Sequence, residues 1–215
     1  MTKIKGHGEK TEKFEPNEGS DEKKIFTYNI NPSVPCLITV INVPVNKLND
    51  NLIKTVKDNV GPLDYKTNVK GLMTEWNISN RYIDRLHQII KEHLPVEEGK
   101  LYDAYYNFLE TWGAIYKHQD FCKPHSHNPF TWSWIYYAQV DEKSSPLELH
   151  NLIKLTDDGT ELSGLRLQPK TGQLVIFPSY VTHSVGKTGG IGEDQWRIIL
   201  AGNIITELTR KNEKR

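Results

Sequence analysis

The chain has only two cysteines in 215 residues, Cys36 and Cys122, and they do not form a C-x-x-C pair. Neither a disulfide framework nor a zinc ribbon is therefore expected. Long apolar runs are also missing: stretches such as 174–177 and 198–201 are far shorter than the ~20 residues that cross a bilayer, and the charged N-terminus has no apolar signal core. We expect no membrane association and a cytoplasmic location, or the host cytoplasm if the protein is viral.

Neither sign of charge is in excess, because 27 lysines and arginines balance 27 aspartates and glutamates. A summed field that attracts nucleic acid or an anionic surface is therefore absent, and no nucleic-acid partner is expected. The length suits a single domain with a sizeable core. Nothing in the sequence indicates an oligomeric state.

The chain divides into a charged tail, at residues 1–24, and one domain, at residues 25–215. The tail is rich in lysine, glutamate, glycine and serine, a composition that buries too little surface to offset chain entropy. After two short strands, at 25–31 and 36–45, apolar residues at helical spacing predict helices from Asn46 or Asn49 to about Val60 and from Ser79 to Leu94.

From Leu101 onward the pattern changes to strands, with turn signals rich in glycine and proline between them. The expected strands are 102–106, 110–116, 131–140, 147–155, 162–167, 173–177 and 195–203. From about Ile204 the chain is expected to run out in a charged tail. Many short strands after two helices predict a mainly β (α+β) fold, a jelly-roll barrel with two supporting N-terminal helices.

Three histidines stand out against this pattern. His125 and His127 are two residues apart on an extended segment, so both imidazoles point to one side, and His183 follows a distant strand. Three neutral nitrogen ligands on one face, with the opposite positions open, suit ferrous iron. An H-x-H pair also arises by chance in a chain with eight histidines, so the spacing alone leaves a surface or core role open.

Arg197 strengthens the metal interpretation because it lies within the apolar strand 196–200. A guanidinium there is costly unless an anion pairs with it, and a carboxylate of an organic cosubstrate is the natural partner. The alternative is an edge-strand arginine that bridges to a surface glutamate.

These motifs together resemble the 2-oxoglutarate- and Fe(II)-dependent oxygenases, in particular those of marine bacteria and their phages. The similarity runs from Trp112 to Asn203 and includes the H-x-H pair, the aromatic strand that follows it, His183 and Arg197. The strand 135–137 also resembles one near the metal motif of prolyl hydroxylases, where a tyrosine helps to bind the cosubstrate carboxylate.

The resemblance implies a double-stranded β-helix with iron and 2-oxoglutarate at its open end. It assigns Tyr137, and Tyr116 upstream, to the cosubstrate pocket beside Arg197. The implied reaction uses Fe(II), 2-oxoglutarate and O2, hydroxylates a peptide or small-molecule substrate, and releases succinate and CO2. The loops 64–76 and 141–146 are candidates for substrate selection, but their residues do not identify the substrate.

One position departs from the commonest family pattern, in which a carboxylate stands two residues after the first histidine. Here that residue is His127, so a set of His125, His127 and His183 would leave the metal centre more positive. Two alternatives remain open: Asp120, which follows His118 at the H-x-D spacing, reaches the metal, or His127 binds only indirectly and water is the third ligand.

Two rival functions have the same barrel. A cupin-type dioxygenase would use three histidines without 2-oxoglutarate, and Arg197 argues against it. A non-catalytic binding module would keep the fold and lose turnover. Succinate production with Fe(II) and 2-oxoglutarate separates the three.

Overall fold

The computed structural model describes residues 24–31, 34–61, 67–94, 102–156, 159–187 and 196–210. Two sheets and two helices make up this part of the chain, which confirms the mainly β fold with two supporting helices. Apart from Lys24, the tail predicted at residues 1–24 lies outside the described residues. Within the described part, neither helix has the length and apolar character needed to cross a membrane.

The strands form two antiparallel sheets. The larger sheet has seven strands, in the order β1 (Lys24–Asn31), β2 (Val34–Asn42), β10 (Gln173–Pro178), β7 (Trp132–Gln139), β12 (Arg197–Arg210), β5 (Tyr102–Tyr116) and β4 (Leu72–Met73). The smaller sheet has five, in the order β3 (Val69–Lys70), β6 (Phe121–His125), β11 (His183–Val185), β8 (Leu147–Thr156) and β9 (Gly159–Leu167). Buried apolar side chains from both sheets form one core between them.

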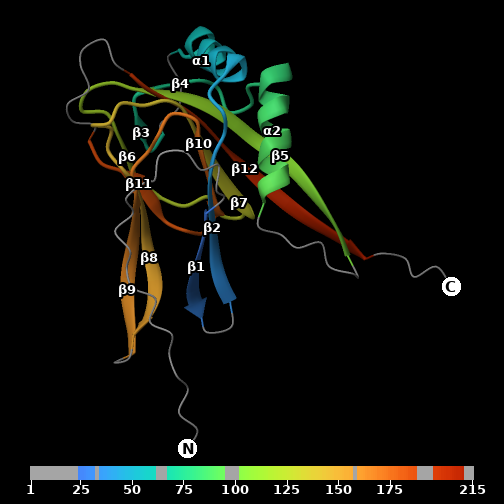
Figure 1. Ribbon diagram of the computed structural model, residues 1–215, viewed down its shortest axis with the longest axis vertical. Coiled ribbons are helices and arrows are strands. Elements are labelled where there is room, and N and C mark those ends of the chain that lie inside the picture. Colours follow the sequence, from blue (N-terminus) through green and yellow to red (C-terminus); the bar gives the residue numbers. More distant parts are fainter. Residues whose placement is uncertain are drawn as a thin grey trace, which may run out of the picture.

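The two helices, α1 (Lys47–Asn59) and α2 (Arg81–His93), pack against the larger sheet on the face away from the smaller one (Figure 1). Both begin near their predicted positions, and an asparagine caps each of them. The side chain of Asn46 accepts the backbone N–H of Leu48, and that of Asn80 accepts from two N–H groups of its first turn. Each cap pairs amide groups that would otherwise have no intrahelical partner.

Side chains of β7 alternate between the two cores. Trp132 and Trp134 pack in the cluster that includes the helices, whereas Ile135 and Tyr137 belong to the cluster between the sheets. The alternation follows from the period of two along a strand. It places both tryptophans in the core beneath the helices.

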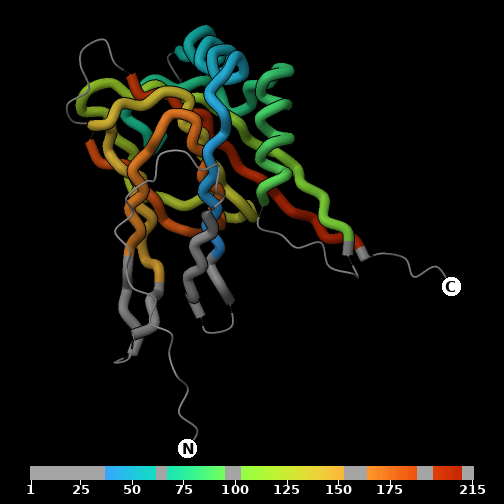
Figure 2. Tube along the Cα trace, viewed as in Figure 1, coloured from blue at the N-terminus to red at the C-terminus, as the bar shows by residue number. Residues whose placement is uncertain are grey.

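Two expectations for the ends of strands are wrong. β5 is one strand where two were expected, and β12 continues to Arg210 where a tail was expected from Ile204. The reason is mutual pairing: β5 and β12 form a continuous antiparallel ladder from Arg197 opposite Tyr116 to Arg210 opposite Tyr102, with one irregularity at Asn203. Figures 1 and 2 show the two strands running side by side away from the body of the protein.

Candidate metal and cosubstrate site

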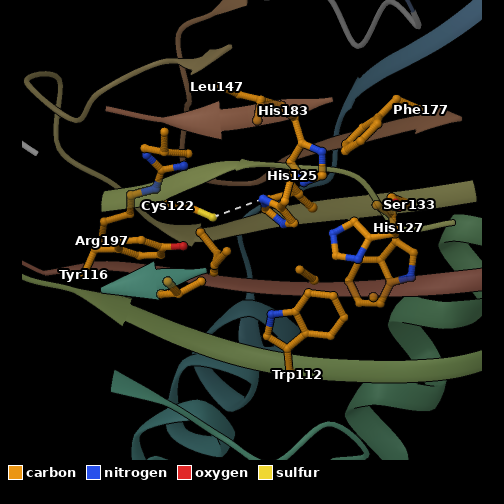
Figure 3. Close-up of a pocket in the computed structure, with 17 residues that line it drawn as sticks. Trp112, Tyr116, Cys122, His125, His127, Ser133, Leu147, Phe177, His183 and Arg197 are labelled. Carbon is orange, nitrogen blue, oxygen red and sulfur yellow. Dashed lines mark hydrogen bonds between the residues drawn. The ribbon is translucent and has the colours of Figure 1, made fainter. Parts of the chain in front are cut away.

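The structure brings the three predicted histidines together between the two sheets. His125 ends β6, His183 begins β11, and these two residues lie opposite each other in the ladder. His127 follows two residues after β6. One ligand atom from each histidine lies within 4.8 Å of the others, and the ring centres are 4.3 to 5.1 Å apart (Figure 3). Within the described ranges, this group can hold a metal ion.

Backbone carbonyls orient two of the three rings. Nδ1 of His125 lies 2.8 Å from the carbonyl oxygen of Lys123, and Nδ1 of His183 lies 3.1 Å from that of Val181. Because a carbonyl oxygen only accepts hydrogen bonds, Nδ1 carries the proton in both rings. Nε2 of each therefore keeps its lone pair, which is the state a metal ligand requires.

Burial keeps the three imidazoles neutral. It lowers the pKa of His183 to about 3 and that of His127 to about 4, with the neighbouring histidines adding to the shift. Burial also lowers the pKa of His125, although its hydrogen bond to the Lys123 carbonyl opposes the effect. All three imidazoles are consequently uncharged at neutral pH, and each has one ring nitrogen with a free lone pair.

The structure does not bring Asp120 into the histidine cluster. It lies in the turn after β5, where its Oδ2 accepts the backbone N–H of Lys117 at 2.8 Å. Its carboxylate is not among the atoms that converge with the histidines. The geometry therefore favours the set of three histidines over a set that uses Asp120.

Arg197 is fully buried at the start of β12, between two aromatic rings. Its guanidinium carbon lies 5.3 Å from the ring centre of Tyr116 and 5.1 Å from that of Tyr137. Nη1 donates to the carbonyl oxygen of Ser145 at 2.8 Å, within the predicted loop 141–146. Both tyrosines assigned to the cosubstrate pocket therefore contact this arginine.

Two of the guanidinium's nitrogens have no hydrogen-bond acceptor in the part of the chain that the structure describes. Nε and Nη2 of Arg197 and the buried hydroxyl of Tyr137 have no hydrogen-bond partner of ordinary distance and angle among these residues. Arg197 and the Tyr137 hydroxyl are nevertheless close enough to interact, because the arginine opposes the rise that burial causes in the pKa of this hydroxyl. A buried cation with unpaired N–H groups is costly unless a ligand supplies the missing acceptors. The arrangement fits a carboxylate, whose two oxygens match neighbouring donors of one guanidinium.

The histidines and the arginine line the same pocket. Its walls include the apolar side chains of Leu147, Phe177 and Ile199. Figure 3 shows the three histidines on one side of the pocket and Arg197 with Tyr116 on the other. A ligand that reaches both sides would therefore contact the metal position and the guanidinium at once.

Two further side chains, Cys122 and Glu110, lie near the histidines. Cys122 lies with its Sγ 3.6 Å from Nδ1 of His125, and burial raises the pKa of this thiol to about 12, so it stays protonated. Glu110 reaches the site through Asn203, whose Nδ2 lies 2.6 Å from the glutamate Oε2 and 3.3 Å from Nδ1 of His127. Only the pairing of β5 with β12 brings Glu110 and Asn203 opposite each other.

Comparison with known proteins gives a family for the part of the chain that holds the site. Residues 110–203 match the family described as "Putative 2OG-Fe(II) oxygenase". A search of curated proteins found no match.

Several solved structures share the fold. A prolyl-4-hydroxylase from Pseudomonas putida is 18% identical, with a TM-score of 0.55 over 78% of this chain and 91% of that one. A prolyl hydroxylase from Trichoplax adhaerens, in complex with a hypoxia inducible factor peptide fragment, is 12% identical, with a TM-score of 0.53 over 78% and 83%. HygX from Streptomyces hygroscopicus, with nickel, 2-oxoglutarate and hygromycin B bound, is 11% identical, with a TM-score of 0.52 over 78% and 82%.

The match includes all of the predicted site residues, and the structural likeness covers 78% of the chain. The predicted jelly-roll is therefore confirmed as the barrel of this group. Residues 110–203 match the 2OG-Fe(II) oxygenase family, and the chain has the double-stranded β-helix fold of the similar solved structures.

Proposed function

We propose that the protein is an Fe(II)- and 2-oxoglutarate-dependent dioxygenase in which His125, His127 and His183 bind the iron. The observation that carries the proposal is the buried guanidinium of Arg197, with two unpaired nitrogens, in the same pocket as the three histidines. The family match supports Fe(II), 2-oxoglutarate and O2 as the cofactors.

The residues present fit a keto-diacid cosubstrate. 2-Oxoglutarate has a keto acid at one end, which can chelate a metal, and a second carboxylate at the other. The histidine cluster and Arg197 stand at the two ends of one pocket, so one molecule can use both. Tyr137 is not among the residues that line the pocket, but it contacts Arg197, and its buried hydroxyl is a further donor at that end.

The protein's own groups then bind, orient and exclude water. His125 and His183 present Nε2 lone pairs that backbone carbonyls have already oriented. Arg197 fixes the far end of the cosubstrate, and the apolar walls keep water out of the pocket. Bound iron with 2-oxoglutarate and O2 would supply the oxidation of a substrate C–H bond, with succinate and CO2 as coproducts.

For the reaction outcome we propose hydroxylation of a peptide or of a small molecule. Two of the similar structures contain such ligands: a peptide fragment in the hydroxylase from Trichoplax adhaerens and hygromycin B in HygX. Both substrate classes belong in the first screen, because the fold accommodates both.

The experiment that tests the proposal measures succinate. Protein supplied with Fe(II), 2-oxoglutarate and O2 should form succinate. His183→Ala should form none, and Arg197→Ala should need a much higher concentration of 2-oxoglutarate. 2-Oxobutyrate, a keto acid without the second carboxylate, is the matched control. Its turnover is read as CO2 release, because its product is propionate and not succinate, and it should be far lower than that of 2-oxoglutarate. Oxygen consumption without any need for 2-oxoglutarate would instead indicate a cupin-type dioxygenase, and no turnover with any screened substrate would favour a binding module.

A further inference from the structure

Asn203 is a fully buried residue of β12 whose side chain has only one orientation compatible with its neighbours. It lies opposite Glu110 of β5, and its amide atom nearest to Glu110 is 2.6 Å from the carboxylate oxygen Oε2. An ionised carboxylate only accepts hydrogen bonds, so this atom is the nitrogen Nδ2. The amide oxygen Oδ1 then accepts from the hydroxyl of Ser133 at 2.8 Å.

The second hydrogen of Nδ2 points toward the ring of His127. The distance from Nδ2 to Nδ1 of that ring is 3.3 Å. An amide nitrogen donates and does not accept, so Nδ1 of His127 is the acceptor and its ring proton lies on Nε2. His125 and His183 have the opposite tautomer, because their Nδ1 atoms donate to carbonyl oxygens.

The same network also holds the backbone of His127. Ser133 gives its one hydroxyl hydrogen to Asn203, so Ser179 donates its own to Ser133 across 2.9 Å. The backbone carbonyl of Ser179 accepts the N–H of His127 at 2.8 Å. Ser133 and Ser179 are buried, which leaves little freedom for the group to rearrange.

We propose that Asn203 is a positioning residue that holds His127 in the Nε2–H tautomer. His125 and His183 then have a free Nε2 lone pair for a metal, whereas His127 must first change its tautomer. For His127 to bind a metal through Nε2, the ring proton moves from Nε2 to Nδ1, with no net gain or loss of protons by the ring. The amide of Asn203 then turns its oxygen toward His127 and its nitrogen toward Ser133. The half-buried Glu110 would lose its donor in this turn and move toward solvent.

A charge-neutral exchange of two side chains tests this proposal. In the double variant Glu110→Gln/Asn203→Asp, the residue at position 203 only accepts, so it favours a proton on Nδ1 of His127 and leaves Nε2 free. The glutamine amide at position 110 donates to the aspartate carboxylate at position 203, and the net charge of the protein is unchanged. Glu110→Gln alone is the matched control, because its amide oxygen can still accept from Asn203.

The tautomers are read from long-range ¹H–¹⁵N correlation spectra of the metal-free protein at neutral pH, with His127→Asn used for assignment. The wild type and Glu110→Gln should show Nε2–H for His127 and Nδ1–H for the other two histidines. The double variant should show Nδ1–H for all three. An Nδ1–H tautomer at His127 in the wild type, or no change in the double variant, overturns the proposal.

Ser133→Ala is the second test of the proposal if the double variant does not fold. Loss of the hydroxyl frees the amide of Asn203 to turn, so the Nδ1–H form of His127 should increase; an unchanged tautomer counts against the proposal.

The consequence for metal binding rests on the proposed function and is measured separately, by titration with Co(II). The double variant should bind Co(II) about tenfold more tightly than the wild type, because partners of metal ligands change affinity by roughly 10- to 100-fold. If the tautomers are as expected but no variant binds Co(II), the iron-dependent function fails while the role of Asn203 stands. If the tautomer switches and the affinity for Co(II) does not rise, then His127 needs no switch and that part of the proposal is wrong.

Discussion

His183 lies directly opposite His125 in the antiparallel ladder between β11 and β6, with the two ring centres 4.3 Å apart. Opposite residues of neighbouring strands place their side chains on the same face of a sheet at close range. The backbone hydrogen bonds of the ladder therefore fix the separation of these two imidazoles before any ligand arrives. The two histidines are a preorganised pair, to which His127 adds a third donor.

Replacing one member of this pair should abolish tight metal binding. We expect His183→Ala to weaken Co(II) binding by at least about 100-fold, since loss of a ligand should cost no less than loss of a partner that orients one. His118→Ala, on an exposed histidine in the turn after β5, is the matched control and should bind as the wild type does. Titration followed by visible absorption measures both. Equal affinity in the two variants would show that the cluster does not bind the metal.

The pair Asp120→Ala and His127→Ala decides the third ligand. Asp120 stabilises a turn and lies outside the histidine cluster, so its replacement should leave the affinity for Co(II) within about threefold of the wild type. His127→Ala should weaken binding by about tenfold or more. Loss of metal from the first variant with retention in the second would mean that the carboxylate, and not the imidazole, completes the site.

Arg197 should control the affinity for 2-oxoglutarate and not that for the metal. Truncation of one partner of a buried charge pair costs roughly 2–5 kcal/mol, so Arg197→Ala should weaken 2-oxoglutarate binding by about 30-fold or more. Arg197→Lys should recover only part of the loss, because an ammonium cannot reproduce the two parallel hydrogen bonds of a guanidinium. Calorimetric titration of Co(II)-loaded protein measures both. Normal binding by Arg197→Ala would refute the cosubstrate assignment.

The same arginine should destabilise the protein when no ligand is bound. Its buried Nε and Nη2 lack acceptors among the described residues. A buried charge left without its partner costs roughly 3–5 kcal/mol. Arg197→Met should therefore raise the unfolding free energy of the ligand-free protein while removing 2-oxoglutarate binding. Urea unfolding checks this, and a less stable variant would mean that unseen acceptors already pair the guanidinium.

The sequence predicted the main elements because their signals are local. Leu48, Leu52 and Val56 repeat at helical spacing in α1, and β7 is a short run of mostly apolar and aromatic residues. The candidate site residues could be found for a similar reason: an H-x-H pair and an arginine within an apolar strand are visible in short stretches of sequence.

What the sequence did not predict depends on pairing between distant segments. β6 contains Lys123 and Pro124 and shows no alternation, yet it is a strand because β3 and β11 pair with it on its two sides. β11 has only three residues and lies between β6 and β8 in the same way. Register between segments is set by the folded sheet, so neither these strands nor the contact of Glu110 with Asn203 has a local signature.

His87 should make the stability of the protein depend on pH. It is partly buried against Phe108, its Nε2 lies 2.9 Å from Oγ1 of Thr111, and burial lowers its pKa to about 4, although Asp84 opposes the shift. The unfolded chain binds this proton near pH 6.5, whereas the folded chain does so only near pH 4. The unfolding free energy therefore falls as the pH falls through this window.

His87→Gln should reduce that dependence. A glutamine amide can still donate to Thr111 but does not titrate, so the slope of unfolding free energy against pH should decrease by up to about 1.4 kcal/mol per pH unit between pH 6 and pH 4.5. Chemical denaturation across this range gives the slope for the variant and the wild type. Identical slopes would show that the folded protein does not hold His87 in its neutral form.

Gly202 should tolerate no side chain, because β5 and Trp134 occupy the space around it. A Cβ added there would clash with the backbone oxygen of Glu110 and lie 2.6 Å from the ring of Trp134. Overpacking of this kind typically costs about 1–3 kcal/mol, which is the loss of stability expected for Gly202→Ala. Asn203 follows Gly202 in β12 and contacts His127. A shift of the strand should therefore also move His127 and weaken Co(II) binding. Gly61→Ala is the control: a Cβ there meets no atom of the described residues within 4 Å, so stability and metal affinity should stay within experimental error of the wild type. A Gly202→Ala variant as stable as the control would show that Trp134 can move aside at no cost, and that its packing does not fix the position of β12.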